Sequence, residues 1–367
     1  MRYTLPLFLL FSAILHANAD ENALVTAQST TPVLLAQHEE GRGLEAVLSG
    51  ADDPAQLESA DESADRKADE NTQKAMDELI SVMPQLGFAT ENEKQKPHAA
   101  DDLDTMVLKF SKMPKMRSAI VMVYDEQGGK PLYGKNTEVV APIASISKLM
   151  TAMVVLDAKL PLDEEISIQP EDINHQKRTR SRTRTGMTMT RGELLKLALM
   201  ASDNLSAAAL ARTYPGGTEA ALAHMNAKAQ ELGMYSSRFL DPTGLNSGNV
   251  STAEDLVKMV QAAKQYELIQ RFTTSTSHTL ELAGHRPVNF HNTNPLVRNA
   301  SWDIGLSKTG YISEAGRCLV MEAKITGRPV IMVLLDSWGR SSRVGDANRV
   351  RKWMESASLR ARDPRKM

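Results

Sequence analysis

The order in which strand and helix patterns occur along the chain is the feature that most constrains its fold. A buried strand pattern covers residues 119–124, and three others come only near the end, at residues 304–308, 318–325 and 330–337. Between them, the apolar residues repeat with a helical period. Strands at both ends with helices between them imply an α/β (α+β) fold. Distant segments would complete one antiparallel sheet, with an all-helical region inserted.

Capping residues and glycines mark where these elements begin and end. A serine or threonine three residues before a glutamate forms a capping box at a helix N-terminus, and glycines between two strands favour a turn. On these signals we expect helices that begin at Ser145, Thr190, Thr218 and Ser251, a further helix at 347–356, and turns at 128–129 and 327–329.

The first 19 residues have the pattern of a secretory signal peptide. Arg2 precedes an apolar run over residues 5–15, and Ala17-Asn18-Ala19 matches a signal-peptidase site. The run is too short for a transmembrane helix, and no other segment approaches the roughly 20 apolar residues that such a helix needs. We therefore expect cleavage of residues 1–19, a periplasmic location and no integral membrane anchor.

Charge divides the remaining chain into two parts. Residues 20–105 carry 20 acids and 6 bases, a net charge of −14, whereas residues 106–367 carry 25 acids and 36 bases, a net charge of +11. The acidic part has too little apolar sequence to offset the entropy of ordering it, apart from a short helical pattern over residues 76–83. We interpret residues 20–105 as an acidic, largely disordered linker and residues 106–367 as the folded domain.

The basic charge of the folded domain favours an anionic partner. In an exported protein, this fits a carboxylate-rich peptide mesh such as peptidoglycan. Nucleic acid is not expected, because the basic residues are not interleaved with the aromatic residues that stack on bases.

The first pattern that carries chemistry is Ser145-Ile146-Ser147-Lys148. Side chains three positions apart lie on the same face of a helix, so Lys148 can approach the hydroxyl of Ser145. A serine becomes a nucleophile when a nearby base takes its proton, and a buried lysine can be that base when it is neutral. Taken alone, a pattern this short is more often part of a surface helix than of an active site.

Two further patterns follow. Residues 202–204, Ser-Asp-Asn, lie between two predicted helices, where these residue types are also common as helix caps. Residues 308–310, Lys-Thr-Gly, end a predicted strand. They offer a cation and a hydroxyl to a carboxylate, next to a glycine that lets the backbone approach a ligand closely.

The three patterns together are the joint signature of class A β-lactamases and penicillin-binding proteins, and they occur here in that order. The chain resembles the low-molecular-mass D-alanyl-D-alanine peptidases, most closely the small D-alanyl-D-alanine endopeptidase branch of penicillin-binding proteins. The resemblance covers about residues 113–357 and implies a β-lactamase/transpeptidase-like fold. It is carried by the three patterns and by residues 181–182, 186, 190–195, 200–204, 241–245, 249–253 and 308–311.

The resemblance implies catalytic roles for four residues. Ser145 would attack the D-Ala carbonyl, and Lys148 would accept its proton. Ser202, hydrogen-bonded to Lys148, would help to return a proton to the leaving amine. The oxyanion would lie between the backbone N–H groups of Ser145 and Tyr311.

Substrate binding would fall to the remaining matching residues. Asn204 would hold the amide backbone of the stem peptide, and Lys308 and Thr309, next to Gly310, would bind the carboxylate beside the scissile bond. The resemblance implies no metal and no other cofactor. Peptidoglycan stem peptides are the expected substrates and β-lactam antibiotics the expected covalent inhibitors.

Three alternatives share these patterns. A class A β-lactamase also needs a Glu-x-x-Leu-Asn sequence between the second and third patterns. No glutamate between Ser202 and Lys308 begins such a sequence. A carboxypeptidase of the family commonly adds a β-rich domain and a membrane-binding helix, whereas only about 30 residues follow Ser337. We therefore favour the endopeptidase. A non-catalytic peptidoglycan-binding module fits least well, because the catalytic set is intact.

Overall fold

The computed structural model of the chain describes residues 108, 114–175, 177, 181–281 and 286–362. The predicted signal peptide, the acidic linker and its short helical pattern lie outside these residues. Leu108 is buried in the core of the sheet region, close to the domain start expected at residue 106.

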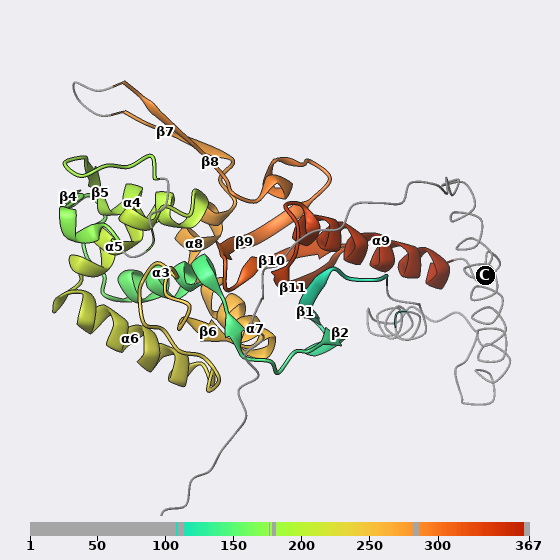
Figure 1. Ribbon diagram of the computed structural model, residues 1–367. Helices are drawn as coiled ribbons and strands as arrows, with labels where there is room; N and C mark the ends of the chain where they lie inside the picture. The colour runs from blue at the N-terminus through green and yellow to red at the C-terminus, as the bar shows by residue number, and fades with distance from the viewer. Residues whose placement is uncertain (1–107, 109–113, 176, 178–180, 282–285, 363–367) are drawn as a thin grey trace, which may run out of the picture. The chain divides into compact units, whose positions relative to one another are not determined.

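Five strands form one antiparallel sheet in the order β2-β1-β11-β10-β9 (Figure 1). Strand β1 lies between its hairpin partner β2 and the distant β11, where Ser118 faces Ser337. The prediction of a single antiparallel sheet closed by distant segments is confirmed. The strands are β1 (Ser118–Asp125), β2 (Lys130–Lys135), β9 (Asp303–Ile312), β10 (Gly316–Ile325) and β11 (Arg328–Ser337).

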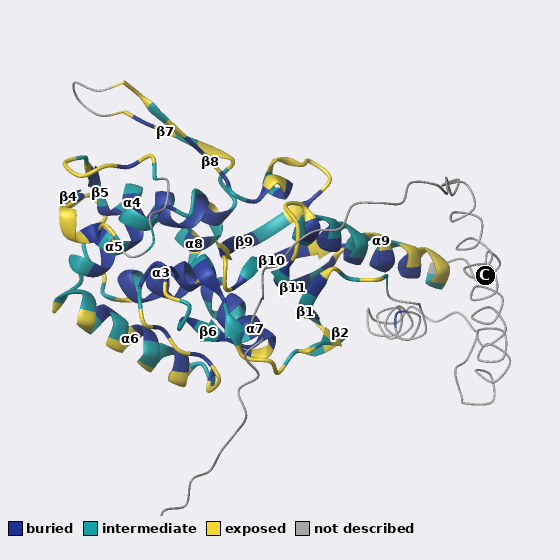
Figure 2. Cartoon of the chain, in the orientation of Figure 1, coloured by how far each residue is buried: buried dark blue, intermediate teal, exposed yellow. Residues whose placement is uncertain are grey.

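Helices cover both faces of this sheet, so its central strands are buried at almost every position (Figure 2). On one face, α9 (Ser342–Arg362) packs Ala347, Val350 and Trp353 against the sheet. On the other face, the core continues into the inserted region. This two-sided burial explains why the strand patterns in the sequence are continuous apolar runs and do not alternate.

The inserted region is mainly helical, but it also contains three short strand pairs that the sequence did not predict (Figure 1). The pairs are β3 (Ala141–Pro142) with β6 (Val250–Ser251), β4 (Glu165–Ser167) with β5 (Thr188–Thr190), and β7 (Ser277–Leu280) with β8 (Val288–His291). The helices are η2 (Ala144–Ser147), α3 (Lys148–Asp157), η3 (Pro170–Asp172), α4 (Arg191–Met200), α5 (Asn204–Arg212), α6 (Gly217–Glu231), α7 (Ala253–Ala263), α8 (Glu267–Thr273) and η4 (Pro295–Arg298).

Several predicted boundaries move by a few residues. Ser145 lies in the 3-10 turn η2, and the α-helix begins only at Lys148. Thr252, one position after the predicted Ser251, caps α7 by accepting a hydrogen bond from the amide of Asp255. The turn between β10 and β11 is tighter than predicted, because Arg328 already pairs with Ile325.

Candidate active site

Ser145 is half-buried in η2, and two glycines allow the main chain to close on it from either side. A Cβ on Gly244 would lie 1.9 Å from the carbonyl oxygen of Ala144, and one on Gly310 would lie 3.2 Å from the amide nitrogen of Ser145. Any larger residue at these positions would push the two segments apart. The loop around Gly244 and strand β9 can therefore both contact the main chain at Ser145.

Lys148 lies one turn beyond Ser145 and is only 1% exposed. Its Nζ donates hydrogen bonds to Ser145 Oγ at 2.9 Å, Asn204 Oδ1 at 2.7 Å and the carbonyl oxygen of Thr243 at 2.6 Å. Burial lowers the pKa of Lys148 from 10.5 to about 7, so a large fraction of this amine is neutral near neutral pH.

The three partners of Lys148 also fix the direction of its lone pair. The side-chain oxygen of Asn204 and the carbonyl of Thr243 can only accept hydrogen bonds, so they occupy the two N–H bonds of a neutral amine. The remaining lone pair then faces the hydroxyl of Ser145. This arrangement can take a proton from Ser145 without any rearrangement.

A buried loop holds the Thr243 carbonyl in place. The carboxylate of Asp241 accepts hydrogen bonds from the amides of Thr243 and Gly244 at 3.1 and 3.0 Å. Asn249 accepts from the amide of Asp241 at 3.1 Å and donates to Ser147 Oγ at 2.9 Å. The charge of Asp241 raises the pKa of Lys148 and so partly offsets the effect of burial. Sequence reasoning gave this loop no role, although the run 241–245 contributed to the family resemblance.

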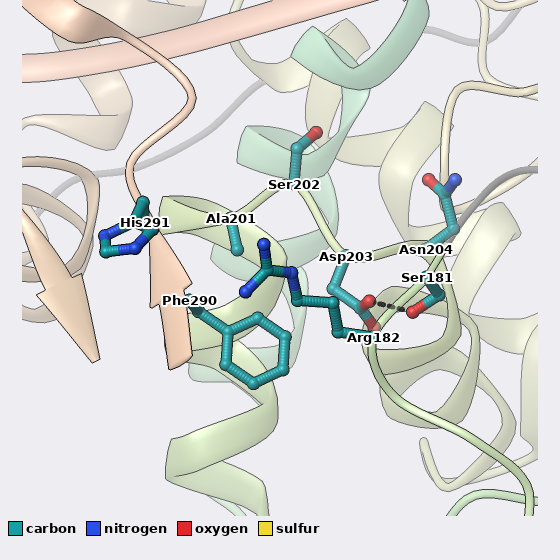
Figure 3. A pocket seen from close by; sticks show the side chains of 8 residues that line it. All are labelled: Ser181, Arg182, Ala201, Ser202, Asp203, Asn204, Phe290 and His291. Atoms are coloured by element: carbon teal, nitrogen blue, oxygen red, sulfur yellow. Dashed lines mark hydrogen bonds between the residues drawn. The ribbon is translucent and has the colours of Figure 1, made fainter. Parts of the chain in front are cut away.

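In the Ser-Asp-Asn turn, the cap and the site are separate residues. Asp203 caps α5, because its carboxylate accepts from the amide of Ser206 at 2.8 Å. The same carboxylate accepts from the hydroxyl of Ser181 (Figure 3) and from that of Thr183. Ser202 has a φ of 59°, a left-handed conformation uncommon outside glycine. The turn therefore holds Ser202 and Asn204 at the cleft while Asp203 anchors it.

Lys308 is also 1% exposed, and it contacts Ser202. Its Nζ donates to Ser202 Oγ at 2.8 Å and to the carbonyl of Thr309 at 2.9 Å. The expected hydrogen bond between Ser202 and Lys148 is therefore wrong: in this structure, Lys148 contacts Asn204 and Lys308 contacts Ser202. Burial, and then the charges of Lys148 and Arg343, lower the pKa of Lys308 well below its usual value.

The residues after Lys308 lie within β9 and not at its end, because the strand continues to Ile312. Thr309 Oγ1 donates to Thr293 Oγ1 at 2.7 Å, and the carbonyl of Gly310 accepts from Arg343 Nη1 at 3.0 Å. Arg343 comes from the first turn of α9 and adds a second cation beside this strand. The sequence gave no signal for it, since no motif surrounds residue 343. Tyr311 points outward with 56% of its surface exposed.

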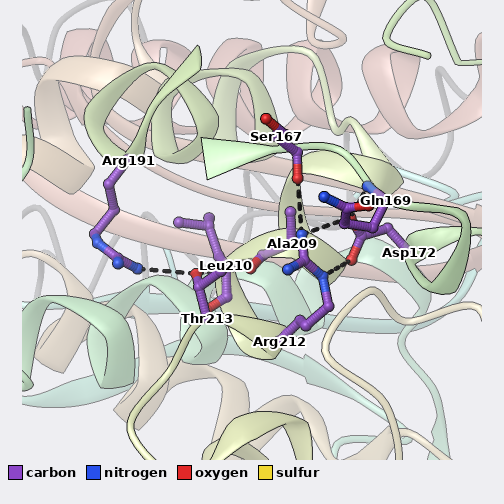
Figure 4. A network of polar contacts seen from close by, with 8 residues as sticks. All are labelled: Ser167, Gln169, Asp172, Arg191, Ala209, Leu210, Arg212 and Thr213. Carbon is purple, nitrogen blue, oxygen red and sulfur yellow. Dashed lines mark hydrogen bonds and ion pairs between the residues drawn. The ribbon is translucent and has the colours of Figure 1, made fainter. Parts of the chain in front are cut away.

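A cavity of about 630 Å³ opens beside Asn204 and Thr243. Its wall near Asp172 is held by Arg212 at the end of α5, whose Nε donates to Asp172 Oδ1 at 2.8 Å (Figure 4). A second bond runs from Arg212 Nη2 to the carbonyl of Ser167 at 2.9 Å. Because α5 begins at Asn204, these contacts fix the cavity wall to the element that carries a site residue.

Neither a metal site nor a membrane-spanning helix is found among the residues that the structure describes. No group of three or more His, Cys, Asp or Glu side chains there could hold a metal ion. No helix in the same part of the chain is long and apolar enough to cross a bilayer.

Comparison with known families settles the broad identity of the chain. A model of the S11 peptidase family, described as D-alanyl-D-alanine carboxypeptidase, matches residues 108–339. The chain belongs to this family. The family predicted from the three patterns is therefore confirmed, as is the prediction that the protein is a serine-type peptidase.

Relatives within the family agree with this assignment. A D-alanyl-D-alanine endopeptidase of Pseudomonas aeruginosa is 45% identical over 248 residues, which cover 67% of this chain and 80% of the relative. One from Escherichia coli is 44% identical over 247 residues, with the same coverage of both chains. The solved DD-transpeptidase of Streptomyces K15 has a TM-score of 0.62 at 26% identity and covers 67% of this chain and 99% of its own. The predicted transpeptidase-like fold is confirmed.

Proposed function

We propose that this S11 peptidase is a D-alanyl-D-alanine endopeptidase that hydrolyses D-Ala-diaminopimelate cross-links of peptidoglycan through an acyl-enzyme on Ser145. The observation that carries the proposal is the 2.9 Å contact between Lys148 Nζ and Ser145 Oγ, because a buried amine with a pKa of about 7 can accept the proton of that hydroxyl when it is neutral. The names of the two relatives above 40% identity supply the choice of endopeptidase.

Acylation begins when Ser145 Oγ attacks the D-Ala carbonyl and its proton passes to Lys148 Nζ. The oxyanion that forms is stabilised by backbone amides next to it, for which Ser145 and Tyr311 are the candidates. Collapse of this intermediate breaks the peptide bond, and the leaving nitrogen needs a proton. The hydroxyl of Ser202 supplies this proton. The ammonium form of Lys308, which donates a hydrogen bond to Ser202, then returns a proton to that hydroxyl.

Deacylation reverses these roles, with water in the place of the leaving amine. A β-lactam follows the first half of the same route, but its leaving nitrogen stays tethered to the acyl group. It therefore blocks Ser145, which makes β-lactams covalent inhibitors in this proposal.

The carboxylate beside the scissile bond binds at Thr309 and the two cations near it, Lys308 and Arg343. An arriving carboxylate raises the pKa of Lys308, because an opposite charge favours the ammonium form. Asn204 serves both the lysine and the substrate. Its side-chain oxygen accepts a hydrogen bond from Lys148, and its side-chain NH2 group can donate to the substrate backbone. Gly310 keeps the edge of β9 open to a peptide backbone.

A carboxypeptidase would use the same residues, because the terminal D-Ala of a stem peptide and the diaminopimelate of a cross-link both carry a carboxylate next to the leaving nitrogen. The family description itself names that activity. A periplasmic location and peptidoglycan stems as the substrate belong to the proposal, on the grounds of the N-terminal signal pattern and the basic folded domain.

Digestion of purified cross-linked muropeptides, followed by mass analysis, tests the proposal. We expect each dimer to yield two monomers, and the Ser145→Ala protein to yield none. Release of a single D-Ala from pentapeptides with dimers left intact would identify a carboxypeptidase. Fluorescent penicillin labelling of the wild type distinguishes both from a non-catalytic binding module, because labelling requires a working nucleophile.

A further inference from the structure

A second cavity, of about 200 Å³, opens on the Ser202 side of the active site. It is lined by Ser202 and Ala201, by Arg182 from the preceding loop, and by Phe290 and His291 at the end of β8. Figure 3 shows the guanidinium of Arg182 between the Phe290 ring and the Ala201–Ser202 turn. This cavity adjoins the larger one beside Thr243, and the two share Ser181 and Asn204 in their linings, whereas Arg182, Phe290 and His291 line only the smaller one.

The position of Arg182 is fixed from both sides. Its neighbours Ser181 and Thr183 bind the carboxylate of Asp203, and its own Nη1 donates to the carbonyl of Asn289. Among the residues that the structure describes, no carboxylate pairs with Arg182. A cation whose remaining donors face a cavity next to Ser202 is suited to an anionic ligand group.

Ser202 marks the leaving side of the scissile bond in the proposed mechanism. The first carboxylate on that side is already assigned to Lys308, Thr309 and Arg343. A released D-alanine carries no other carboxylate, so a carboxypeptidase has no use for a further cation there. A leaving diaminopimelate continues into a second stem peptide, which carries additional carboxylates beyond the leaving nitrogen.

We propose that Arg182 binds a second carboxylate of the leaving stem peptide and so selects cross-linked over uncross-linked substrates. Phe290 and His291 form the opposite wall of this subsite. The inference rests on the proposed endopeptidase function and goes further, because it assigns substrate choice to a residue outside the three motifs. The planar guanidinium can hold a carboxylate with two parallel hydrogen bonds, which lysine cannot do.

The first test compares Arg182→Ala and Arg182→Lys with the wild type, and uses Arg238→Ala as a matched loss of one exposed positive charge elsewhere. We expect Arg182→Ala to lower kcat/KM for a cross-linked muropeptide dimer roughly 10- to 100-fold. Penicillin acylation and D-Ala release from a pentapeptide monomer should stay close to wild type, which also shows that the variant folds. Arg182→Lys should recover only part of the loss, and Arg238→Ala should behave as wild type.

The second test removes the ligand group instead of the arginine. A dimer whose leaving stem keeps the carboxylate beside the scissile bond but has its other free carboxylates amidated should be cleaved by the wild type as slowly as Arg182→Ala cleaves the normal dimer. The two losses should not add. Additive losses, or an unchanged rate for Arg182→Ala on normal dimers, would overturn the subsite while leaving the endopeptidase function standing. Failure of the wild type to cleave any dimer would overturn both.

Discussion

The Nζ of Lys308 lies 2.8 Å from the hydroxyl of Ser202, and this contact joins the third motif of the chain to the second. Lys148 makes the equivalent contact with Ser145 at 2.9 Å. The cleft therefore contains two serine–lysine pairs, each with a buried lysine whose pKa is lowered. In the proposed mechanism, one pair removes a proton from the attacking oxygen and the other supplies a proton to the leaving nitrogen.

Replacement of Lys308 by alanine should slow peptide cleavage more than acylation by simple neutral esters. A peptide loses both its carboxylate partner and the proton supply through Ser202, whereas an ester has a better leaving group and no carboxylate to bind. The measurement is kcat/KM for a peptide and an ester on the same preparation. An equal loss on both substrates would contradict the assignment and point to a role in folding or in the attack step.

Ser145→Ala should abolish covalent penicillin labelling and peptide cleavage while leaving the fold intact. The serine is only half-buried, and Lys148 keeps its bonds to Asn204 and Thr243, so the free energy of unfolding should change by no more than about 1 kcal/mol. Thermal unfolding and gel labelling on one sample check both parts. A labelled alanine variant would mean that the nucleophile is a different residue.

The acylation rate should rise with pH up to about 7 and then level off, because the neutral form of Lys148 is the reactive one and its pKa is about 7. The contribution of Lys148 to the free energy of unfolding also increases with pH. The folded-state pKa lies below the unfolded value of 10.5, so the unfolded chain binds more protons between pH 7 and 10.5 and this contribution to stability increases over that range.

Lys148→Met tests the stability side of this linkage. Methionine removes the cost of burying a charge, but it also removes the hydrogen bonds of the amine. We therefore expect the free energy of unfolding to increase by roughly 1–3 kcal/mol at pH 6. The gain should shrink as the pH rises from 7 past 10.5, since the wild-type lysine becomes neutral first in the folded state and then in the unfolded state. Urea unfolding of both proteins at pH 6 and pH 9 measures the difference. A gain that is independent of pH would show that Lys148 does not titrate in this range.

Asp241→Asn should move the pH profile of acylation to lower pH. The charge of Asp241 raises the pKa of Lys148, so its removal lets burial lower that pKa further. Asparagine keeps one oxygen for the amides of Thr243 and Gly244, which limits the damage to the loop. Pre-steady-state acylation by a chromogenic β-lactam at several pH values gives the midpoint. A midpoint at or above that of the wild type would contradict this electrostatic role.

The sequence was sufficient for the sheet, and its three motifs supplied the residues of the proposed site. The strands of residues 118–125 and 328–337 are recognisable because burial on both faces makes them continuously apolar. Ser145, Ser202 and Lys308 are recognisable because each stands in a short motif whose local context, a helix start, a turn or a strand, can also be seen in the sequence.

The pairing inside the site could not be predicted in the same way. Which lysine contacts Ser202 depends on how two buried side chains from α3 and β9 share one cleft, and no local pattern encodes that distance. Arg343 was missed because its contact with Gly310 joins residues 33 positions apart on different elements. The cap of α7 was misplaced by one residue, since Ser251 and Thr252 are equally able to cap and only the backbone geometry selects Thr252.

The acidic segment 20–105 is the subject of the last prediction. Its charge of −14 is attached to a domain of charge +11, so it can fold back over a basic cleft or be repelled by an anionic cell wall. We expect a protein that starts at residue 106 to cleave soluble muropeptides at nearly the rate of the full mature chain, and to differ from it on intact sacculi.

Salt decides whether that difference is electrostatic. The Debye length falls from about 10 Å at 0.1 M to about 3 Å at 1 M, so either action of the segment must weaken as salt is added. The comparison is therefore made between the mature chain and the truncated form, on muropeptides and on sacculi, at both salt concentrations. If the two forms differ equally at low and high salt, charge is not the cause. The apolar helical pattern at residues 76–83 then becomes the better explanation, because hydrophobic contact with a partner is not screened by salt.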